Sequence, residues 1–179
     1  MTRDQRFRTL YEQHFESIRA YCLRRLPVAD ANDAVAEVFL TVWRKGDVIP
    51  TDDARPMLFG IARNVVLHAK RSLARRARLR VKVSGLAAER SLGPEMETVQ
   101  GAEARRVRWV LDTLPKRDRD VLKLRVWEGL TAAQIAEVVG ASVPATEKRI
   151  SRGYVKFERA LRRIAPDLTE TFATRGGER

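Results

Sequence analysis

The sequence predicts an all-α protein in which a flexible linker joins two small helical domains, the second containing a helix-turn-helix. Apolar residues recur at three- and four-residue steps through most of the chain, as in amphipathic helices. No long strand pattern and no Asn-Gly hairpin signal accompanies them. A segment punctuated by Gly85, Gly93, Pro94 and Gly101 separates two helical halves. We therefore expect domains at 1–82 and 103–179, with the linker at 83–102.

Three helices are expected in the first domain. The first carries one apolar stripe and ends at Pro27: Phe7, Leu10, Tyr11, Phe15, Ile18, Cys22 and Leu26. The second should begin at an Asp30 N-cap and end near Gly46. The third follows a loop at 46–53 and turns its apolar residues inward: Leu58, Ile61, Ala62, Val65, Ala69 and Leu73. The helical spacing of four aromatic residues indicates core positions: Tyr11, Phe15, Phe39 and Trp43.

The second domain ends in a predicted helix-turn-helix. Two earlier helices are indicated by apolar stripes on either side of Pro115. Thr131 and Gln134 form a capping box at the start of a short helix, which Gly140 ends. Ser142 can cap the next helix, whose outer face should carry polar and charged side chains suited to a DNA major groove: Glu147, Lys148, Arg149, Ser151, Arg152 and Lys156. A solvated basic helix in a small bundle is the alternative interpretation.

Charge indicates a polyanionic partner. The chain has a net charge of +12 and a pI near 10.8, which in a folded protein favours nucleic acid through counterion release. Residues 1–82 carry 17 basic and 9 acidic side chains, residues 83–102 carry 1 and 3, and residues 103–179 carry 17 and 11. Two basic domains on either side of an acidic linker suggest two nucleic-acid contacts. The acid-free run from Lys70 to Lys82 is expected to follow a DNA backbone, or else to be a solvated basic tail.

Other classes of protein lack their sequence signatures. Cys22 is the single cysteine, so no disulfide framework or Cys-x-x-Cys metal site is expected. No signal peptide or membrane span is indicated, and we expect a cytoplasmic protein without membrane insertion. His14 and His68 lack partners at metal-ligand spacing, so neither a metal nor a cofactor is expected. No catalytic motif is present, so no catalytic residue is assigned.

Short motifs in both halves resemble one protein family. Leu114-Pro115, 121–125, 128–131, 134–136 and Ser151-Arg152 are similar to the C-terminal promoter-binding domain of small sigma factors. Residues 30–39, Val42-Trp43 and 61–64 resemble the N-terminal domain of the same proteins. The likeness runs from about Phe7 to Arg163 and points to the extracytoplasmic-function (ECF) group of the sigma-70 family. Ala36, Met57 and Glu147 differ from the residues usual in that group.

The resemblance implies a factor that binds core RNA polymerase and directs promoter-specific transcription initiation. It implies polymerase docking by the helix that holds Asp33, Val35, Glu37 and Phe39. It implies recognition and melting of the minus-ten element by the following helix, through Arg63, Asn64, Lys70, Arg71 and Arg75. The helix-turn-helix would recognise the minus-35 element through Ser142, Glu147, Lys148, Arg149 and Arg152. Promoter DNA, duplex and single-stranded, and an anti-sigma factor are the other expected partners.

Two other classes remain as alternatives. Response-regulator output domains share a Leu-rich helix, an Ile-Ala pair and a recognition helix, but the first half here lacks the alternating strands and acidic pocket of a phosphoacceptor domain. A helical nuclease would also be basic. Its carboxylate cluster would have to be Asp30, Asp33 and Glu37, which helix capping and the docking resemblance explain better.

Overall fold

The structure is a computed structural model that describes residues 2–50, 52–84 and 99–168. The chain divides into two compact units, Met1–Pro94 and Glu95–Arg179. The described residues form seven α-helices and one 3-10 helix, and no strand occurs among them. The expected all-α class with two helical domains is confirmed.

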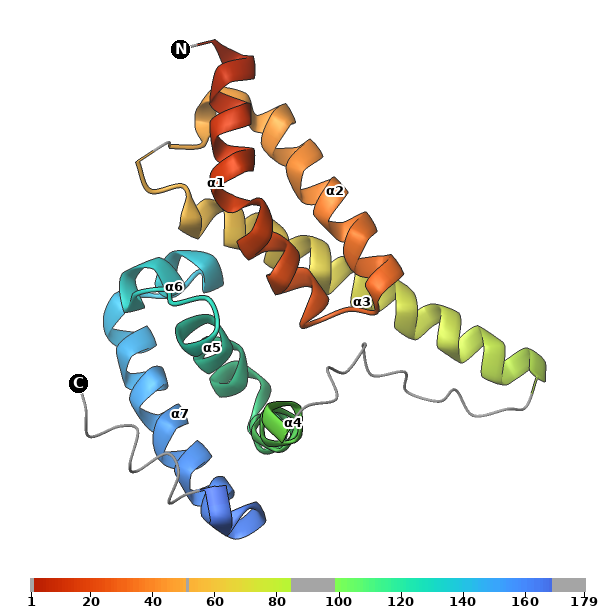
Figure 1. Cartoon of the computed structure of the whole chain (residues 1–179), viewed down its shortest axis with the longest axis vertical. Helices are drawn as coiled ribbons and strands as arrows, with labels where there is room; N and C mark the ends of the chain where they lie inside the picture. Colours follow the sequence, from red (N-terminus) through yellow and green to blue (C-terminus); the bar gives the residue numbers. More distant parts are fainter. Residues whose placement is uncertain (1, 51, 85–98, 169–179) are drawn as a thin grey trace. The chain divides into compact units, whose positions relative to one another are not determined.

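The first unit is built from three helices that contact one another in pairs (Figure 1). They are α1 (Arg3–Leu23), α2 (Val28–Lys45) and α3 (Arg55–Ser84), with the 3-10 helix η1 (Gly46–Val48) after α2. The core takes one apolar stripe from each helix, and Ile18, Val38 and Leu58 are fully buried. The sequence predicted these stripes because burial of an amphipathic face leaves a period of 3.6 residues.

The helix boundaries in the first unit differ from expectation at two places. α1 ends at Leu23, before Pro27, with Arg24 as its C-cap. The expected N-cap at Asp30 is wrong. α2 begins at Val28 with Pro27 in the N-cap position, and no side chain caps it. Asp30 lies in the first turn, where its carboxylate accepts a hydrogen bond from Arg76 of α3 at 3.0 Å.

The last turns of α3 extend past α1 and α2 (Figure 1). α3 contains nine Lys or Arg residues and no acid in 30 residues. From Ala74 to Val81 every side chain except the half-buried Ala77 is exposed, including Leu79 at 62%. A helix with this much like charge gains little stability from its own side-chain pairs, so its basic end is suited to an external polyanion.

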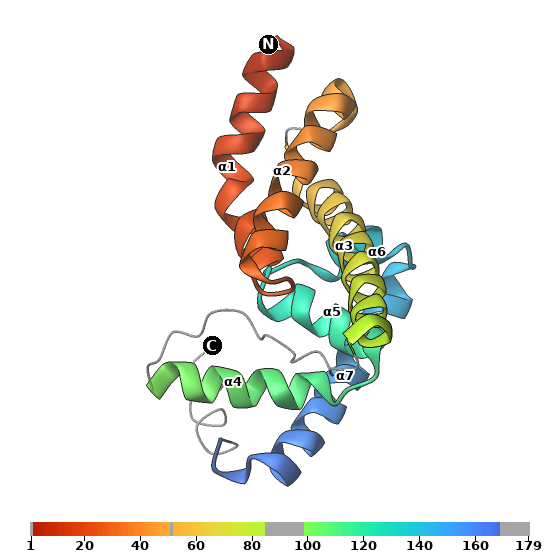
Figure 2. The ribbon, with the colours of Figure 1, turned by 90° about the vertical axis from the view of Figure 1, so that its right-hand side faces the viewer.

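The second unit is organised around its last helix. It contains α4 (Val99–Asp112), α5 (Lys116–Val126), α6 (Ala132–Val139) and α7 (Val143–Ile164), and the other three helices all contact α7. Figure 2 shows α4 next to the last turns of α7, where Val110 packs with Ala160 and Leu161. Nearby, the Arg106 guanidinium binds the Asp167 carboxylate through two contacts of 2.5 and 2.6 Å.

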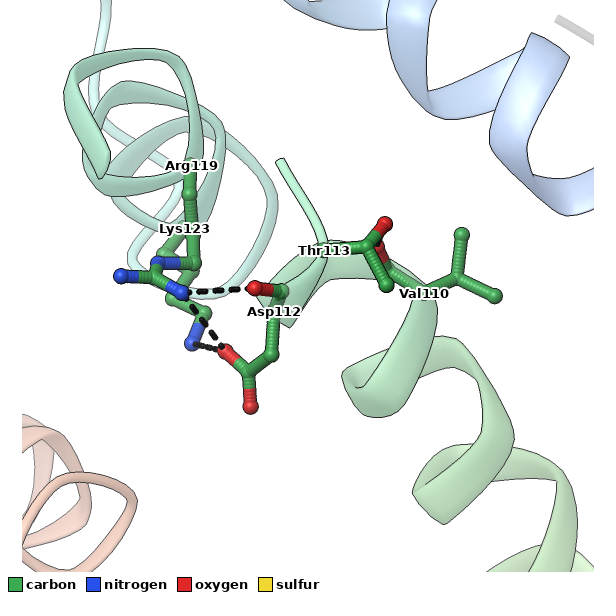
Figure 3. A network of polar contacts seen from close by, with 5 residues as sticks. All are labelled: Val110, Asp112, Thr113, Arg119 and Lys123. Atoms are coloured by element: carbon green, nitrogen blue, oxygen red, sulfur yellow. Dashed lines mark hydrogen bonds and ion pairs between the residues drawn. The ribbon is translucent and has the colours of Figure 1, made fainter. Parts of the chain in front are cut away.

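The joint between α4 and α5 is held by one acidic residue (Figure 3). The Asp112 carboxylate accepts a hydrogen bond from Lys123 Nζ at 2.8 Å and lies 3.7 Å from Arg119 Nη1. Arg119 also donates to the Asp112 carbonyl oxygen at 2.9 Å, which satisfies a carbonyl at the end of α4. These contacts and the buried Leu111, Leu114 and Leu122 fix α4 on α5.

Helical structure occupies both ends of the segment expected to be a linker. α3 continues to Ser84 and α4 begins at Val99, so both helices enter the range 83–102. The middle of the expected linker, 85–98, lies outside the described residues, and its flexibility stays a prediction.

Candidate nucleic-acid interface and docking surface

The helix-turn-helix of the second unit is formed by α6 and α7, as the sequence predicts. Thr131 Oγ1 accepts from Gln134 N at 3.2 Å, and Gln134 Oε1 accepts from Thr131 N at 3.0 Å, which completes the capping box. At the other end of α6, Gly140 adopts φ +68° and the Ala141 amide reaches back to the Ala136 carbonyl at 2.9 Å. This Schellman ending needs a left-handed residue, and glycine adopts that conformation without strain.

The beginning of α7 is defined by its own cap. Ser142 is the N-cap, and its hydroxyl accepts from Ala145 N at 3.4 Å. Pro144 lies in the first turn, where a missing amide costs no intrahelical bond. Thr146 and Leu161 are buried on the inner face. The turn between α6 and α7 is therefore short and specified at both ends, which fixes the direction of α7.

α7 passes so close to α5 at Gly153 that an added Cβ would crowd Leu122. A Cβ built on the buried Gly153 would lie 3.1 Å from Leu122 Cγ and 3.2 Å from Leu122 Cδ1. Because Gly153 has no side chain, the inner face of α7 can pack closely on α5. The outer face of α7 consequently stays in solvent.

The residues predicted to read duplex DNA are at the surface of this outer face. Ser142, Glu147, Lys148 and Arg152 are exposed, and Arg149 is half-buried. Arg152 Nε donates to the Lys148 carbonyl at 3.3 Å, within the helix. Among the residues that the structure describes, no carboxylate forms an ion pair with the cations of this group. Guanidinium and ammonium groups in this state are suited to guanine edges and phosphates, and a carboxylate such as Glu147 to the cytosine amino group.

Lys156 is the exception among the outer residues of α7. It is exposed, as the sequence predicted, but its ammonium also donates to Asp118 Oδ2 of α5 at 2.6 Å. No helical periodicity could have predicted this pair, because the partners are 38 residues apart and meet only when α5 packs on α7.

A second basic face lies along α3. Of the residues predicted to bind the minus-ten element, Asn64, Lys70, Arg71 and Arg75 are exposed and Arg63 is half-buried. Separations of seven and eleven residues bring Asn64, Arg71 and Arg75 to one side of the helix, and Arg63 and Lys70, seven residues apart, share the adjacent flank. His68 is exposed and has helical spacing with Asn64 and Arg71. Arg76 is turned away to Asp30, so α3 binds α2 on one side and offers cations on another.

The helix predicted to dock on polymerase combines exposed acids with a pocket. Asp33 and Glu37 are exposed one turn apart on α2, whereas Val35 and Phe39 are 7% and 5% exposed. Val35 and Phe39 line a pocket of about 280 Å³ between α1 and α2, together with residues from both helices: Tyr11, Phe15, Arg19, Asn32 and Ala36. Helical spacing places the two acids beside Asn32 and Ala36, at the edge of the pocket.

An aromatic cluster forms one wall of this pocket. The ring centroids of Tyr11 and Phe39 are 4.7 Å apart, and those of Tyr11 and Phe15 are 4.9 Å apart. The prediction of core positions is right for Phe39, but Tyr11 and Trp43 are 38% and 37% exposed. Sequence reasoning missed the contribution of α1, although the i, i+4, i+8 spacing of Tyr11, Phe15 and Arg19 was a signal for it. It also missed Leu40, which is 47% exposed and has helical spacing with both acids.

The remaining candidate groups do not assemble a chemical site. Burial and the nearby Arg55 guanidinium lower the pKa of His14. No group of three or more His, Cys, Asp or Glu side chains that could hold a metal ion occurs in the described part of the chain. Cys22 is buried. None of the helices described here is long and apolar enough to cross a bilayer.

The two basic surfaces lie within segments that match two family models. The family models named sigma-70 region 2 and sigma-70 region 4 match residues 10–76 and 104–157. The ECF RNA polymerase sigma factor SigL of Mycobacterium tuberculosis is 31% identical over 172 residues, which cover 92% of this chain and 91% of the relative. The RNA polymerase sigma factor CnrH of Cupriavidus metallidurans is 30% identical over 148 residues, covering 76% and 75% of the two chains.

Solved structures share the same helical architecture. The structure of CnrH with the cytosolic domain of CnrY superposes with a TM-score of 0.62 at 25% identity, covering 87% of this chain and 86% of that one. The sigma factor RpoE of Bartonella quintana, solved with the anti-sigma factor NepR, gives a TM-score of 0.65 at 19% identity over 87% and 96% of the chains.

The chain belongs to the ECF group of the sigma-70 family. It functions in promoter-directed transcription initiation with RNA polymerase, and its partners are core polymerase and promoter DNA. The family consists of transcription regulators rather than classical enzymes.

Proposed function

We propose that the three surfaces divide the work of initiation. The acidic edge and pocket of α1 and α2 dock on core RNA polymerase, the basic face of α3 captures the minus-ten element, and the outer face of α7 reads the minus-35 element. The chain contributes no catalytic residue, metal or cofactor of its own and works in the cytoplasm. The observation that carries this proposal is the α6–α7 geometry, in which two caps and the Gly153 crossing hold a cationic helix face in solvent.

The role of α7 follows from its chemistry. The N-terminal half of a recognition helix enters the major groove, and that half holds Glu147, Lys148, Arg149 and Arg152. A long-range ionic contact to phosphates positions the helix, and bidentate contacts to base edges select the sequence. Glu147 would prefer a cytosine amino group, so the upstream element recognised here should include a G·C pair opposite that position.

The role of α3 follows from its charge and exposure. Unpaired bases need a polar surface that can hydrogen-bond their edges, and their backbone needs cations. Asn64 offers the amide, Arg71 and Arg75 offer charges on the same helix face, and Lys70 adds a charge on the adjacent flank. These four side chains are exposed, and the last turns of α3 beyond them extend past α1 and α2 (Figure 1).

The relatives support a further partner. CnrH was solved with the cytosolic domain of CnrY, and RpoE of Bartonella quintana was solved with the anti-sigma factor NepR. We propose that this chain is also held by an anti-sigma factor, which would cover the apolar and acidic docking surface and compete with core polymerase.

Transcription with purified core polymerase on a promoter library tests the proposal. The full chain should select templates with two separate sequence elements. Arg149→Ala and Arg152→Ala should change or weaken selection at the upstream element only, with losses of about 1–3 kcal/mol at one base position for a base contact. Arg162→Ala is the matched control, because it removes the same charge from the far end of α7, where Arg162 pairs with Glu158. If Arg149→Ala and Arg152→Ala select templates at the upstream element in the same way as the control Arg162→Ala, the assignment of α7 is contradicted.

A further inference from the structure

One cation of α7 is neutralised within the protein. Lys156 Nζ lies 2.6 Å from Asp118 Oδ2, and the side chains are 46% and 13% exposed, respectively. Lys156 has helical spacing with Arg149 and Arg152, seven and four residues earlier, so all three occupy the same flank of α7. The two arginines have no carboxylate partner in the described part of the chain, and Lys156 has one.

The Asp118 carboxylate, which pairs with Lys156, is largely buried near the start of α5. It lies in the first turn of α5, where the helix dipole favours a negative charge, and Pro115 at the N-cap position supplies no capping side chain. The residue is 9% exposed. Its neighbour Arg119 is directed to Asp112 at the α4–α5 joint (Figure 3). The carboxylate is thus fixed before DNA binds, and Lys156 finds it at little further cost in conformational entropy.

We propose that Asp118 sets the sequence-independent part of DNA affinity by withholding Lys156 from the phosphate backbone. The proposal rests on the role of α7 proposed above. A free lysine on this flank would add one phosphate contact that every DNA sequence offers equally. The pair with the largely buried Asp118 is screened less by salt than a contact in open solvent, so the lysine stays with the carboxylate. Binding by α7 then depends more on the side chains that read bases: Glu147, Lys148, Arg149 and Arg152.

The salt dependence of binding by holoenzyme containing the full chain tests this proposal. Affinity for a promoter duplex and for a scrambled duplex is measured between 50 and 200 mM salt. Asp118→Asn should steepen the slope of log affinity against log salt by about 0.9, the value for one added phosphate contact, on both duplexes. Over this range its affinity should fall about threefold to fourfold more than that of the unaltered chain.

Lys156→Met should leave the slope unchanged, because the lysine that it removes does not contact phosphate. The double variant Asp118→Asn with Lys156→Met should return to the slope of the unaltered chain. Asp120→Asn is the matched control: it makes the same change of charge on α5, but Asp120 forms no ion pair with the residues described here. Circular dichroism of each variant confirms that the helices remain.

Three outcomes would overturn the proposal: an unchanged slope for Asp118→Asn, a steep slope that persists in the double variant, or a flatter slope for Lys156→Met. Arg152→Ala, measured alongside, separates this failure from failure of the proposed function. If Arg152→Ala alters neither the slope nor the affinity for the promoter duplex, α7 is not at the DNA. If Arg152→Ala flattens the slope or weakens binding to the promoter duplex, and Asp118→Asn does not steepen the slope, α7 binds DNA but Asp118 does not withhold Lys156.

Discussion

At the scale of single residues, side chains that the sequence groups together separate into different roles. Asp33, Val35, Glu37 and Phe39 follow one another on α2, but the two acids are in solvent and the two apolar residues line the pocket. Likewise, Arg75 and Arg76 are adjacent in sequence, and only Arg76 is bound to Asp30. A basic or acidic run therefore overstates the number of side chains available to a partner.

The paired acids of α2 give a prediction about polymerase docking. Asp33→Ala combined with Glu37→Ala should weaken capture of core polymerase, because two exposed carboxylates one turn apart can meet a basic surface together. A pull-down with purified core enzyme measures the effect, and circular dichroism checks the fold. Asp4→Ala with Glu12→Ala removes the same charge from exposed positions of α1 as a control. Undiminished capture by the folded Asp33 and Glu37 variant would refute the docking assignment.

Gly60 in α3 and Gly153 in α7 should respond to substitution in opposite ways. Gly153→Val should destabilise the second unit by about 1–3 kcal/mol, because the new methyl groups meet Leu122. Gly60→Ala should stabilise the first unit by about 0.5–1 kcal/mol, because its Cβ meets nothing within 4 Å and alanine is the better helix former. Urea unfolding measures both effects. A fully stable Gly153→Val variant would show that α5 and α7 can separate without loss.

At the scale of helices, the residues at the helix ends define the structure as much as the apolar faces do. α6 has eight residues, too few to be stable alone, and its capping box and Schellman ending specify where it starts and stops. The sequence predicted both ends of α6 because the residues that form each end lie only a few positions apart in the chain. The sequence did not predict the start of α2, because Pro27 occupies the N-cap position and no side chain caps the helix.

The capping box of α6 gives a prediction at this scale. Thr131→Ala should cost about 1 kcal/mol of stability, since the Gln134 amide loses its acceptor. Thr131→Ser keeps the hydroxyl and should retain most of the stability. The same loss should weaken upstream-element binding, because α6 supports the start of α7. Thermal unfolding together with duplex binding measures both, and equal behaviour of the alanine and serine variants would contradict a capping role.

At the scale of the whole molecule, two basic units are joined by one chain, and each holds a different candidate surface. The first unit offers the docking surface and the basic face of α3, and the second offers α7. A covalent connection turns the second contact with a promoter into an intramolecular event at high effective concentration. Two weak contacts can then give one selective complex.

Separated units should consequently bind without initiating transcription. Residues 1–94 should bind core polymerase and, with it, single-stranded minus-ten DNA. The unit that starts at Glu95 should bind duplex upstream DNA weakly and with steep salt dependence. A start at Glu95 keeps α4 whole, because that helix begins at Val99. Promoter opening by either unit alone with core polymerase would contradict this division, and so would failure of the first unit to bind single-stranded DNA beside polymerase.

The sequence by itself determined the helical class, the two halves, the caps of the helix-turn-helix and the family. Each of these depends on contacts between residues a few positions apart, so periodicity and short motifs record them. The tertiary structure decided which charges are free. The pairs Asp30–Arg76, Asp112–Lys123 and Asp118–Lys156 join different helices, and so does the close crossing at Gly153. Such contacts exist only after the helices pack, because packing sets the distance between side chains that are far apart along the chain.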